Sequence, residues 1–222
     1  MATTAEVRRC TRLRGEPMRG RAAPERDSMS GTTNEGKEFM HYLSHYESPL
    51  GAMTMASDGE HLTGLWFDGQ KYDRSTIDDD AVLQPRLPVF TQTAQWLDAY
   101  FEGADPGFTP PISIEGSDFR KMVTSIMLSI PFGATSTYAR IAAEVARRTG
   151  RKQMSAQAVG GAVGHNPITL IVPCHRVLAS DGSLRGYAGG VDRKERLLEM
   201  EGVNMSGLST PPAADDGGGR RE

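Results

Sequence analysis

Cysteine is scarce in this chain, because its 222 residues include only two, Cys10 and Cys174. Two distant cysteines cannot form the dense disulfide framework of a small secreted domain, and they suit a reducing cytoplasm. They also supply too few ligands for a structural zinc site, which takes about four closely spaced Cys or His side chains. The cysteine content therefore predicts a cytoplasmic protein that holds no structural metal ion.

Long hydrophobic runs are also missing. No apolar stretch approaches the ~20 residues needed to span a membrane, and the first residues lack the hydrophobic region of a signal peptide. Since 38% of the residues are hydrophobic, the chain can still bury the core of one large domain or two small ones. We expect a protein that does not associate with membranes.

The two ends of the chain lack any periodic apolar pattern. Residues 1–39 are rich in Arg, Gly, Pro, Ser and Thr, and residues 206–222 include two consecutive prolines and three consecutive glycines. Segments of such composition do not bury enough apolar surface to offset the entropy lost on folding. We predict a disordered N-terminal arm at 1–39 and a disordered tail at 206–222.

Residues 40–112 have the pattern of a small αβ domain. Strands are predicted at 50–57 and 61–67, and they flank Asp58-Gly59, a dipeptide typical of tight hairpin turns. Pro88 is placed to open an amphipathic helix, since proline is favoured at the first helical position. Nothing in this segment requires chemistry, so we expect it to serve as a scaffold.

Residues 113–205 have a helical pattern. Ser117 can cap a first helix, and a second begins near Thr137. After a basic turn, Ser155 can cap a short helix at 156–163, which is rich in small residues and can approach another surface closely. Two helices joined by a short basic turn suggest a DNA-binding helix-turn-helix, although an ordinary helix pair has the same pattern.

Charge is divided unevenly between these two segments. Residues 41–115 contain 3 Lys/Arg and 12 Asp/Glu, a net charge of −9, whereas residues 116–205 contain 12 and 7, a net charge of +5. A polyanion is repelled by the first segment and attracted by the second. The charges therefore agree with nucleic-acid binding by the second segment, although a merely solvated basic face would carry the same charge.

The motif that indicates chemistry is Pro173-Cys174-His175-Arg176. The thiolate is the reactive form of cysteine, and a neighbouring imidazole and positive charge both favour it. The apolar residues 168–172 predict a buried, extended segment that leads to Cys174. A cysteine and a histidine alone would as readily be a structural pair, so the surrounding motifs decide the interpretation.

A last helix is predicted at 192–201, because Asp192-Arg193-Lys194-Glu195 resembles a capping box. Glu201 at its end can orient His175, which would complete a set of nucleophile, base and orienting carboxylate with Cys174. A surface carboxylate would have the same spacing, so both readings of Glu201 stay open.

Together these motifs resemble the O6-alkylguanine-DNA alkyltransferases, the methylated-DNA–protein-cysteine methyltransferases, over roughly residues 42–203. The motifs that carry the resemblance are Ala158-Val159-Gly160-Gly161-Ala162, Asn166-Pro167, Ile171-Val172-Pro173-Cys174-His175-Arg176-Val177, Gly186-Tyr187-Ala188-Gly189-Gly190 and the pattern Lys194…Leu197-Leu198…Glu201-Gly202. The resemblance implies an α/β (α+β) fold. A ribonuclease H-like αβ domain at 40–112 would precede a helical, DNA-binding alkyltransferase domain at 113–205 with a winged-helix-like helix-turn-helix.

The resemblance also implies a reaction, direct reversal of alkylation damage. An alkyl group moves from O6 of guanine, and less well from O4 of thymine, in double-stranded DNA onto Cys174, irreversibly and once per molecule. The damaged base must first rotate out of the duplex. No metal ion and no cofactor is required by this chemistry, and we expect the protein to act as a monomer.

The resemblance assigns roles to individual residues. His175 takes the thiol proton through a water molecule, and Glu201 holds the imidazole. Tyr187 donates a hydrogen bond to the departing guanine, and Asn166 ties the helix-turn-helix to the active-site segment. Backbone groups at Val177, Ala188 and Gly189 are expected to line the base pocket. The residues expected to contact DNA are Tyr138, Arg151, Lys152, Gln157, Ala158, Gly160 and Arg176, with Tyr138 promoting rotation of the base.

One position departs from the family pattern. Relatives commonly carry an arginine just before Ala-Val-Gly, where it fills the space left by the rotated base, and this chain has Gln157 there. The preceding turn is longer and basic, with Arg151 and Lys152 in it. We hypothesise that Gln157 fills the gap, while the basic turn restores affinity for phosphates.

Two alternatives compete with a repair enzyme. A non-catalytic, alkyltransferase-like protein would bind DNA lesions, but such relatives replace the nucleophile, which is present here as Cys174. A cysteine hydrolase would use Cys174 and His175, but no oxyanion-hole motif stands out and the helix-turn-helix would have no use.

Overall fold

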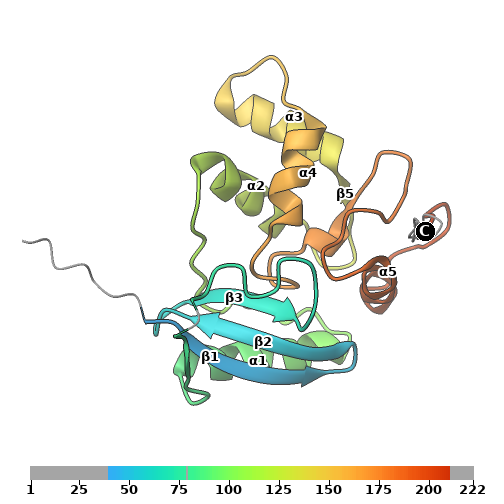
Figure 1. Ribbon diagram of the computed structural model, residues 1–222. Coiled ribbons are helices and arrows are strands. Elements are labelled where there is room, and N and C mark those ends of the chain that lie inside the picture. The colour runs from blue at the N-terminus through green and yellow to red at the C-terminus, as the bar shows by residue number, and fades with distance from the viewer. Residues whose placement is uncertain (1–39, 79, 211–222) are drawn as a thin grey trace, which may run out of the picture. The chain divides into compact units, whose positions relative to one another are not determined.

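The computed structural model describes residues 40–78 and 80–210, which all belong to one compact unit, Glu38–Glu222 (Figure 1). The predicted disordered arm at 1–39 and most of the predicted tail lie outside the described residues. Within the described part of the chain, no helix is both long and apolar enough to cross a membrane.

The first part of the unit is a four-stranded sheet with the strand order β3-β2-β1-β4. β1 (Tyr42–Ser48), β2 (Gly51–Ser57) and β3 (Leu62–Phe67) form antiparallel pairs, and the short β4 (Val82–Leu83) runs parallel to β1. The two strands and the hairpin turn predicted in this segment are confirmed. In the turn, the Asp58 carboxylate accepts hydrogen bonds from two backbone N–H groups.

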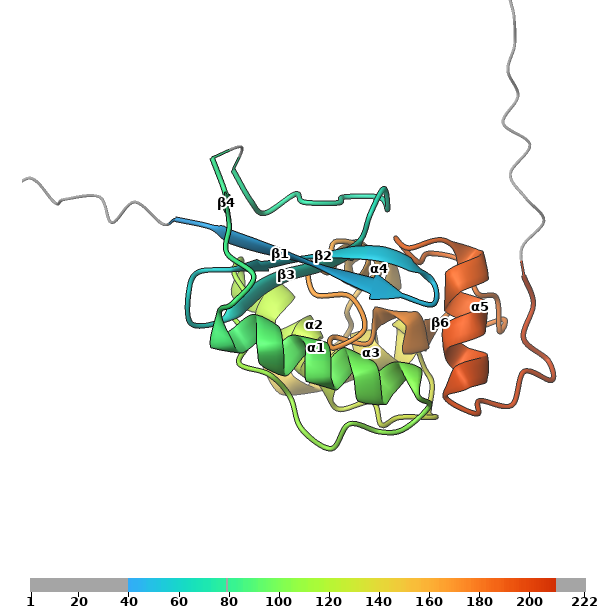
Figure 2. The same cartoon turned by 90° about the horizontal axis from the view of Figure 1, so that it is seen from below.

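One helix, α1 (Pro88–Phe101), lies along one face of this sheet (Figure 2). Pro88 stands at its start, as predicted. Its buried face includes Phe90, Leu97 and Tyr100, each no more than 1% exposed. Because α1 is amphipathic, it covers the apolar side of the sheet and carries Tyr100 toward the second part of the unit.

The second part of the unit is helical, with α2 (Asp118–Leu128), α3 (Tyr138–Thr149) and α4 (Ala156–Gly164) packed on one another (Figure 1). The caps predicted from sequence are confirmed, because Ser117 and Ser155 each accept a hydrogen bond from the backbone N–H three residues later. A short turn joins α3 to α4, which gives the pair the connectivity of a helix-turn-helix.

The segment before Cys174 differs from its prediction. Residues 168–172 are buried, as expected, but they turn back on themselves instead of extending. Ile168 forms a single parallel bridge to Leu65 on β3, and Leu170 takes a left-handed conformation with φ of 71°. Such a turn needs long-range partners that the local sequence does not reveal. Cys174 then begins a short 3₁₀ turn, Cys174–Arg176.

Two short strands and a last helix complete the fold. β5 (Ser136–Thr137) pairs in parallel with β6 (Val177–Leu178), so the residues before α3 lie beside those after the 3₁₀ turn. α5 (Val191–Met200) begins one residue earlier than predicted, after Gly190. The predicted capping box is wrong, because no side chain caps this helix.

The first residues of the predicted disordered tail pack against the rest of the unit. Residues 206–210 are described and ordered, since Leu208 packs on a small apolar cluster with Leu184 and Leu198. The Ser209 N–H donates to the Gly182 carbonyl, and the Leu184 N–H donates to the Ser209 carbonyl. The packing of Leu208 and these two backbone hydrogen bonds together hold this stretch in place.

Candidate active site

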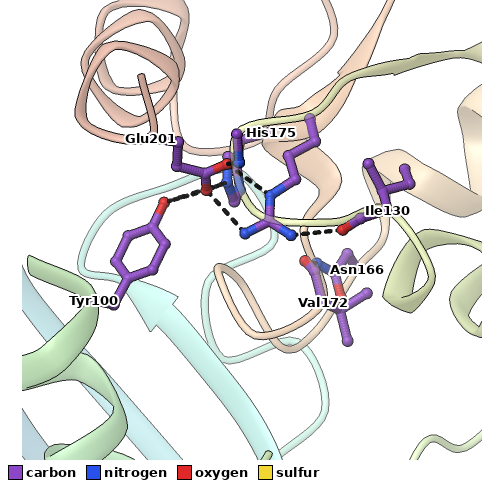
Figure 3. Close-up of polar contacts among 8 residues, drawn as sticks. Tyr100, Ile130, Asn166, Val172, His175 and Glu201 are labelled. Atoms are coloured by element: carbon purple, nitrogen blue, oxygen red, sulfur yellow. Dashed lines mark hydrogen bonds and ion pairs between the residues drawn. The ribbon is translucent and has the colours of Figure 1, made fainter. Parts of the chain in front are cut away.

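Asn166 fixes the position of the Cys174 thiol. Its side-chain Nδ2 lies 2.8 Å from the Val172 carbonyl oxygen, 3.2 Å from the Ile168 carbonyl oxygen and 3.1 Å from Cys174 Sγ. Its Oδ1 accepts a hydrogen bond from the Ile168 N–H. One amide thus closes the turn after α4 and contacts the sulfur. Figure 3 shows Asn166 beside Val172.

The Glu201 carboxylate lies at the centre of a buried hydrogen-bond network (Figure 3). It accepts five hydrogen bonds, two of them from the Arg176 guanidinium at 2.8 and 3.0 Å. The others come from His175 Nε2 and the Tyr100 hydroxyl, both at 2.7 Å, and from the Gly133 N–H at 3.2 Å. Of the two readings of Glu201, the surface carboxylate is therefore wrong.

The tautomer of His175 follows from this geometry. A carboxylate is only an acceptor, so Nε2 carries the hydrogen that Glu201 receives and Nδ1 is left as a free acceptor. Nδ1 is buried and has no partner among the described side chains and backbone. His175 is therefore oriented as a base whose open nitrogen can accept a proton.

Burial sets the protonation states of this pair. Burial raises the pKa of the Cys174 thiol, and this effect exceeds the opposing hydrogen bond from Asn166 and charge of Lys194. Burial also lowers the pKa of the His175 imidazole, more than Glu201 raises it. Burial thus outweighs the effect of the neighbouring positive charge and disfavours the charged forms of both groups, so the thiol needs a base.

Arg176 corrects a sequence prediction. We expected it on the DNA-binding surface, but its side chain is buried and its Nη1 donates to the Ile130 carbonyl at 2.7 Å (Figure 3). Its remaining hydrogen bonds go to Glu201. Burial alone would raise the pKa of the Glu201 carboxyl, but the hydrogen bonds from His175 and Arg176 outweigh it and lower the pKa to about 2. Arg176 keeps Glu201 ionised and does not face DNA.

Tyr187 lies beside the same site, with its ring centroid 6.4 Å from that of His175. Its hydroxyl is buried without a partner in the described residues, and burial raises its pKa well above the usual value. Gly189 makes room for the ring, because a Cβ at that position would lie 2.6 Å from it. The hydroxyl is therefore a proton donor that nothing else in the site uses.

A cavity of about 410 Å³ reaches this tyrosine. Five glycine or alanine residues and the aromatic side chains Tyr72, His165 and Tyr187 are among the residues that line it. The carbonyls of all three residues predicted to line the base pocket already have partners. The Ala188 carbonyl accepts a hydrogen bond from the Lys71 N–H. The Val177 carbonyl accepts from the buried Lys194 ammonium at 2.6 Å, and burial lowers the pKa of Lys194 to about 8.

Arg193 connects the base pocket to the sheet. Its guanidinium donates to the Gly189 carbonyl at 3.0 Å and to the Leu50 carbonyl, in the turn between β1 and β2, at 2.9 Å. It also lies 4.7 Å from the ring centroid of Phe67 on β3. One side chain of α5 thus holds the two parts of the unit together next to Tyr187.

Most residues expected to contact DNA gather around two grooves of α3 and α4. A groove of about 860 Å³ is lined by Tyr138, Gln157 and Gly160, and on its other wall by Arg185. A second groove, of about 800 Å³, is lined by the basic turn that includes Arg151 and Lys152, together with Gln157. Ala158 is exposed on the same helix. The structure therefore brings together all of these predicted residues except Arg176.

Sequence reasoning missed three residues near the site. Tyr100 belongs to an Ala-Tyr-Phe-Glu-Gly run that resembles the family, but nothing local indicated that its hydroxyl reaches Glu201. Arg185 precedes the glycine-rich run at Gly186, and a cation there was a usable signal. Lys194 was taken for part of a helix cap and is fully buried instead. Among residues 40–78 and 80–210, no three His, Cys, Asp or Glu side chains gather in a way that could hold a metal ion.

The fold and site define a class of protein. A sheet domain supports a helix-turn-helix part, which carries a buried thiol, Cys174, next to a histidine that can act as its base, His175. Comparison with protein families makes this specific. Residues 41–114 match the ribonuclease-like domain of 6-O-methylguanine DNA methyltransferase, and residues 118–203 match its DNA-binding domain. The chain belongs to this family of DNA repair methyltransferases, which confirms the resemblance and the predicted fold.

Individual relatives agree with this assignment. The methylated-DNA–protein-cysteine methyltransferase of Mycobacterium bovis is 39% identical over 163 residues, which cover 73% of this chain and 93% of that protein. The crystal structure of O6-methylguanine methyltransferase from Mycobacterium tuberculosis superposes with a TM-score of 0.63 at 39% identity, covering 73% of this chain and 93% of that one. A structure of the latter in complex with DNA has a TM-score of 0.62 at 38% identity, over 72% and 92% of the two chains.

Proposed function

We propose that this protein repairs alkylated double-stranded DNA by moving the alkyl group from O6 of guanine, and less well from O4 of thymine, onto Cys174. The observation that carries the proposal is the matched pair of neutral groups, a buried thiol held by Asn166 and an imidazole oriented by Glu201. A neutral thiol beside a neutral base can react with an alkyl carbon once its proton is taken. The curated relatives carry the name of this activity.

The chemistry balances without a metal ion or cofactor. The Cys174 proton passes to His175 Nδ1 through a water molecule, while the sulfur attacks the alkyl carbon in line with the C–O6 bond. As the S–C bond forms, the C–O6 bond breaks and its electron pair leaves with the guanine. The Tyr187 hydroxyl gives its proton to the purine, so the guanine departs as a neutral molecule. The proton held on His175 then passes back to the Tyr187 phenolate, so that overall one proton moves from the thiol to the guanine. The product is a thioether, which makes the reaction single-turnover.

DNA binding precedes this step. The groove between α4 and the loop that carries Arg185 is lined by Tyr138, Gln157 and glycines, which leave room for a nucleic-acid backbone. The basic turn at Arg151 and Lys152 supplies contacts for phosphates. In this proposal Tyr138 presses on the strand, and Gln157 enters the space that the rotated base leaves. The Mycobacterium tuberculosis relative crystallised with DNA supports this partner.

Mass spectrometry tests the proposal directly. The protein is mixed with a duplex that contains one O6-methylguanine, and the intact protein and its peptides are weighed. We expect one methyl group per molecule, on the peptide that contains Cys174, and none in the Cys174→Ala variant. The variant should still bind the lesion duplex, because the thiol lies outside both grooves. An unmodified wild-type protein that binds the lesion tightly would instead indicate a non-catalytic lesion-binding protein.

A further inference from the structure

The ribonuclease-like part of the chain contributes one polar group to the reaction centre. Tyr100 lies on α1, is 1% exposed, and its hydroxyl donates to Glu201 Oε1 at 2.7 Å. The Tyr100 hydroxyl oxygen itself lies 3.3 Å from His175 Nε2. Figure 3 shows Tyr100 reaching Glu201 from outside the segment that carries His175. We propose that Tyr100 is a positioning residue for alkyl transfer, which holds the Glu201–His175 pair in its productive geometry and keeps His175 neutral. The inference rests on the proposed function.

The hydroxyl of Tyr100 has a task separate from the packing of its ring. The ring stacks on Trp96 at 5.1 Å between centroids and meets Phe101 and Phe132 edge to face at 5.5 and 6.0 Å. These contacts fix the ring whether or not it carries an oxygen. A buried hydroxyl without a partner destabilises a fold, so its direction toward Glu201 is specific.

The hydroxyl affects the proton affinity of His175 through the shared oxygen. Tyr100 and His175 both donate to Oε1, so the hydrogen bond from Tyr100 partly neutralises the charge that would stabilise an imidazolium. The other groups that act on His175 are the cations of Arg176 and Lys194, which disfavour its protonation, together with Cys174 and Tyr187. Without the Tyr100 hydroxyl, Glu201 attracts the proton on His175 more strongly.

The test is the Tyr100→Phe variant, with Tyr46→Phe as the matched control. Tyr46 contacts the same helix α1, and its hydroxyl also donates to a carboxylate, that of Asp98 at 2.8 Å. Three quantities are measured for both variants: the single-turnover rate of alkyl transfer against pH, the pKa of His175 by NMR in the unreacted protein, and the affinity for lesion DNA. The NMR measurement does not depend on activity, so it separates failure of this inference from failure of the proposed function.

We expect Tyr100→Phe to raise the pKa of His175 by about half a unit to one unit. A protonated His175 cannot accept the thiol proton, so the acidic fall in rate should move to higher pH by the same amount. The maximal rate should drop about tenfold as the imidazole loses its fixed orientation. Affinity for lesion DNA should stay unchanged, and Tyr46→Phe should match the wild type in all three quantities.

Two results overturn the inference. One is a Tyr100→Phe protein whose His175 pKa and rate profile superimpose on those of the wild type. The other is an equal shift in both variants, which would indicate a general effect of altering α1. Should Tyr100→Phe fail to fold, 3-fluorotyrosine at position 100 replaces it. The fluorinated phenol is more acidic and donates a stronger hydrogen bond. The acidic fall in rate should therefore move to lower pH. An unchanged pH profile would contradict the inference.

Discussion

The buried network around Cys174 and the exposed face of α3 and α4 both contain ion pairs, but they hold them differently. Glu201 is buried and accepts five hydrogen bonds from fixed donors. Glu144 on α3 pairs with Arg147 and Arg148 at 2.7 and 2.8 Å in contact with solvent. A buried pair is costly to break, whereas an exposed pair contributes little and can exchange partners. The groups around Glu201 are thus held rigidly, whereas the arginines at the end of α3 are held only loosely.

The largest expected effect follows from breaking the buried pair. Arg176→Ala leaves the Glu201 carboxylate buried without its cation and should reduce the free energy of unfolding by about 3–5 kcal/mol. Arg148→Ala removes one arginine from the exposed pair and should leave that free energy close to the wild-type value. Urea unfolding of both variants measures the difference. Equal losses in the two variants would remove the distinction between the two regions.

The second-largest expected effect is a loss of folding stability at acidic pH, as the groups of the buried network become protonated. A carboxyl whose folded pKa lies below its unfolded value stabilises the fold above the unfolded pKa, and that contribution disappears as the pH falls toward the folded pKa. For Glu201 this window runs from 4.5 down to about 2. His175, whose pKa burial lowers from 6.5, acts in the same direction, so stability should already decline below that pH.

The Glu201→Gln variant isolates the carboxyl. At neutral pH it should be less stable than the wild type, because Arg176 loses its buried partner. The gap should narrow as the pH falls through the window of Glu201, since the wild type then loses the same charge. Urea unfolding at a series of pH values gives the gap, and a constant gap would contradict the assignment.

A smaller effect is expected on the exposed face. Glu144→Gln frees Arg147 and Arg148 for phosphates, so lesion-DNA affinity should rise about two- to fivefold at low salt. The dependence of affinity on salt should also become steeper. Glu102→Gln, at the end of α1, removes the same charge elsewhere and serves as the control. A gain in the control as large as that in Glu144→Gln would mean that net charge alone is responsible.

The smallest effect concerns Gln157. It is exposed at the start of α4, beside the groove that Arg185 borders. If it already fills the space left by the rotated base, Gln157→Arg should leave lesion affinity similar or improve it by a small factor. Fluorescence anisotropy with a lesion duplex measures this. A steep loss of binding would show that the groove is shaped for the amide.

The sequence predicted those features that local patterns determine. The caps at Ser117 and Ser155 and the hairpin at Asp58-Gly59 depend on neighbours within a few residues, and each is confirmed. The predictions that failed concern features that depend on partners far away in the sequence. Leu170 adopts a left-handed conformation inside a loop closed by Asn166, and no local signal predicted it.

The sequence predicted which residues form the site better than it predicted the surroundings of each residue. Glu201 was chosen correctly as a partner of His175, and Asn166 lies within hydrogen-bond distance of the Cys174 sulfur. The raised pKa of the Cys174 thiol was not predicted, because burial causes it and burial is a property of the whole fold. Arg176 was assigned to the surface for the same reason, since only Glu201, far along the chain, reveals where its guanidinium points.

Arg193 has a consequence for anyone who wishes to reuse this protein in pieces. Its guanidinium donates a hydrogen bond to the Leu50 carbonyl and lies over the ring of Phe67, and both of these residues belong to the sheet part. The helix that carries Arg193 borders the base pocket. A chain cut before α2 would leave this cation without those partners, and it would also remove the Tyr100 hydroxyl from the Glu201 carboxylate. The helical part is therefore a poor module for transplantation. To keep the shape of its pocket, an engineered helical part would need replacements for three groups: the Leu50 carbonyl oxygen, the Phe67 ring and the Tyr100 hydroxyl.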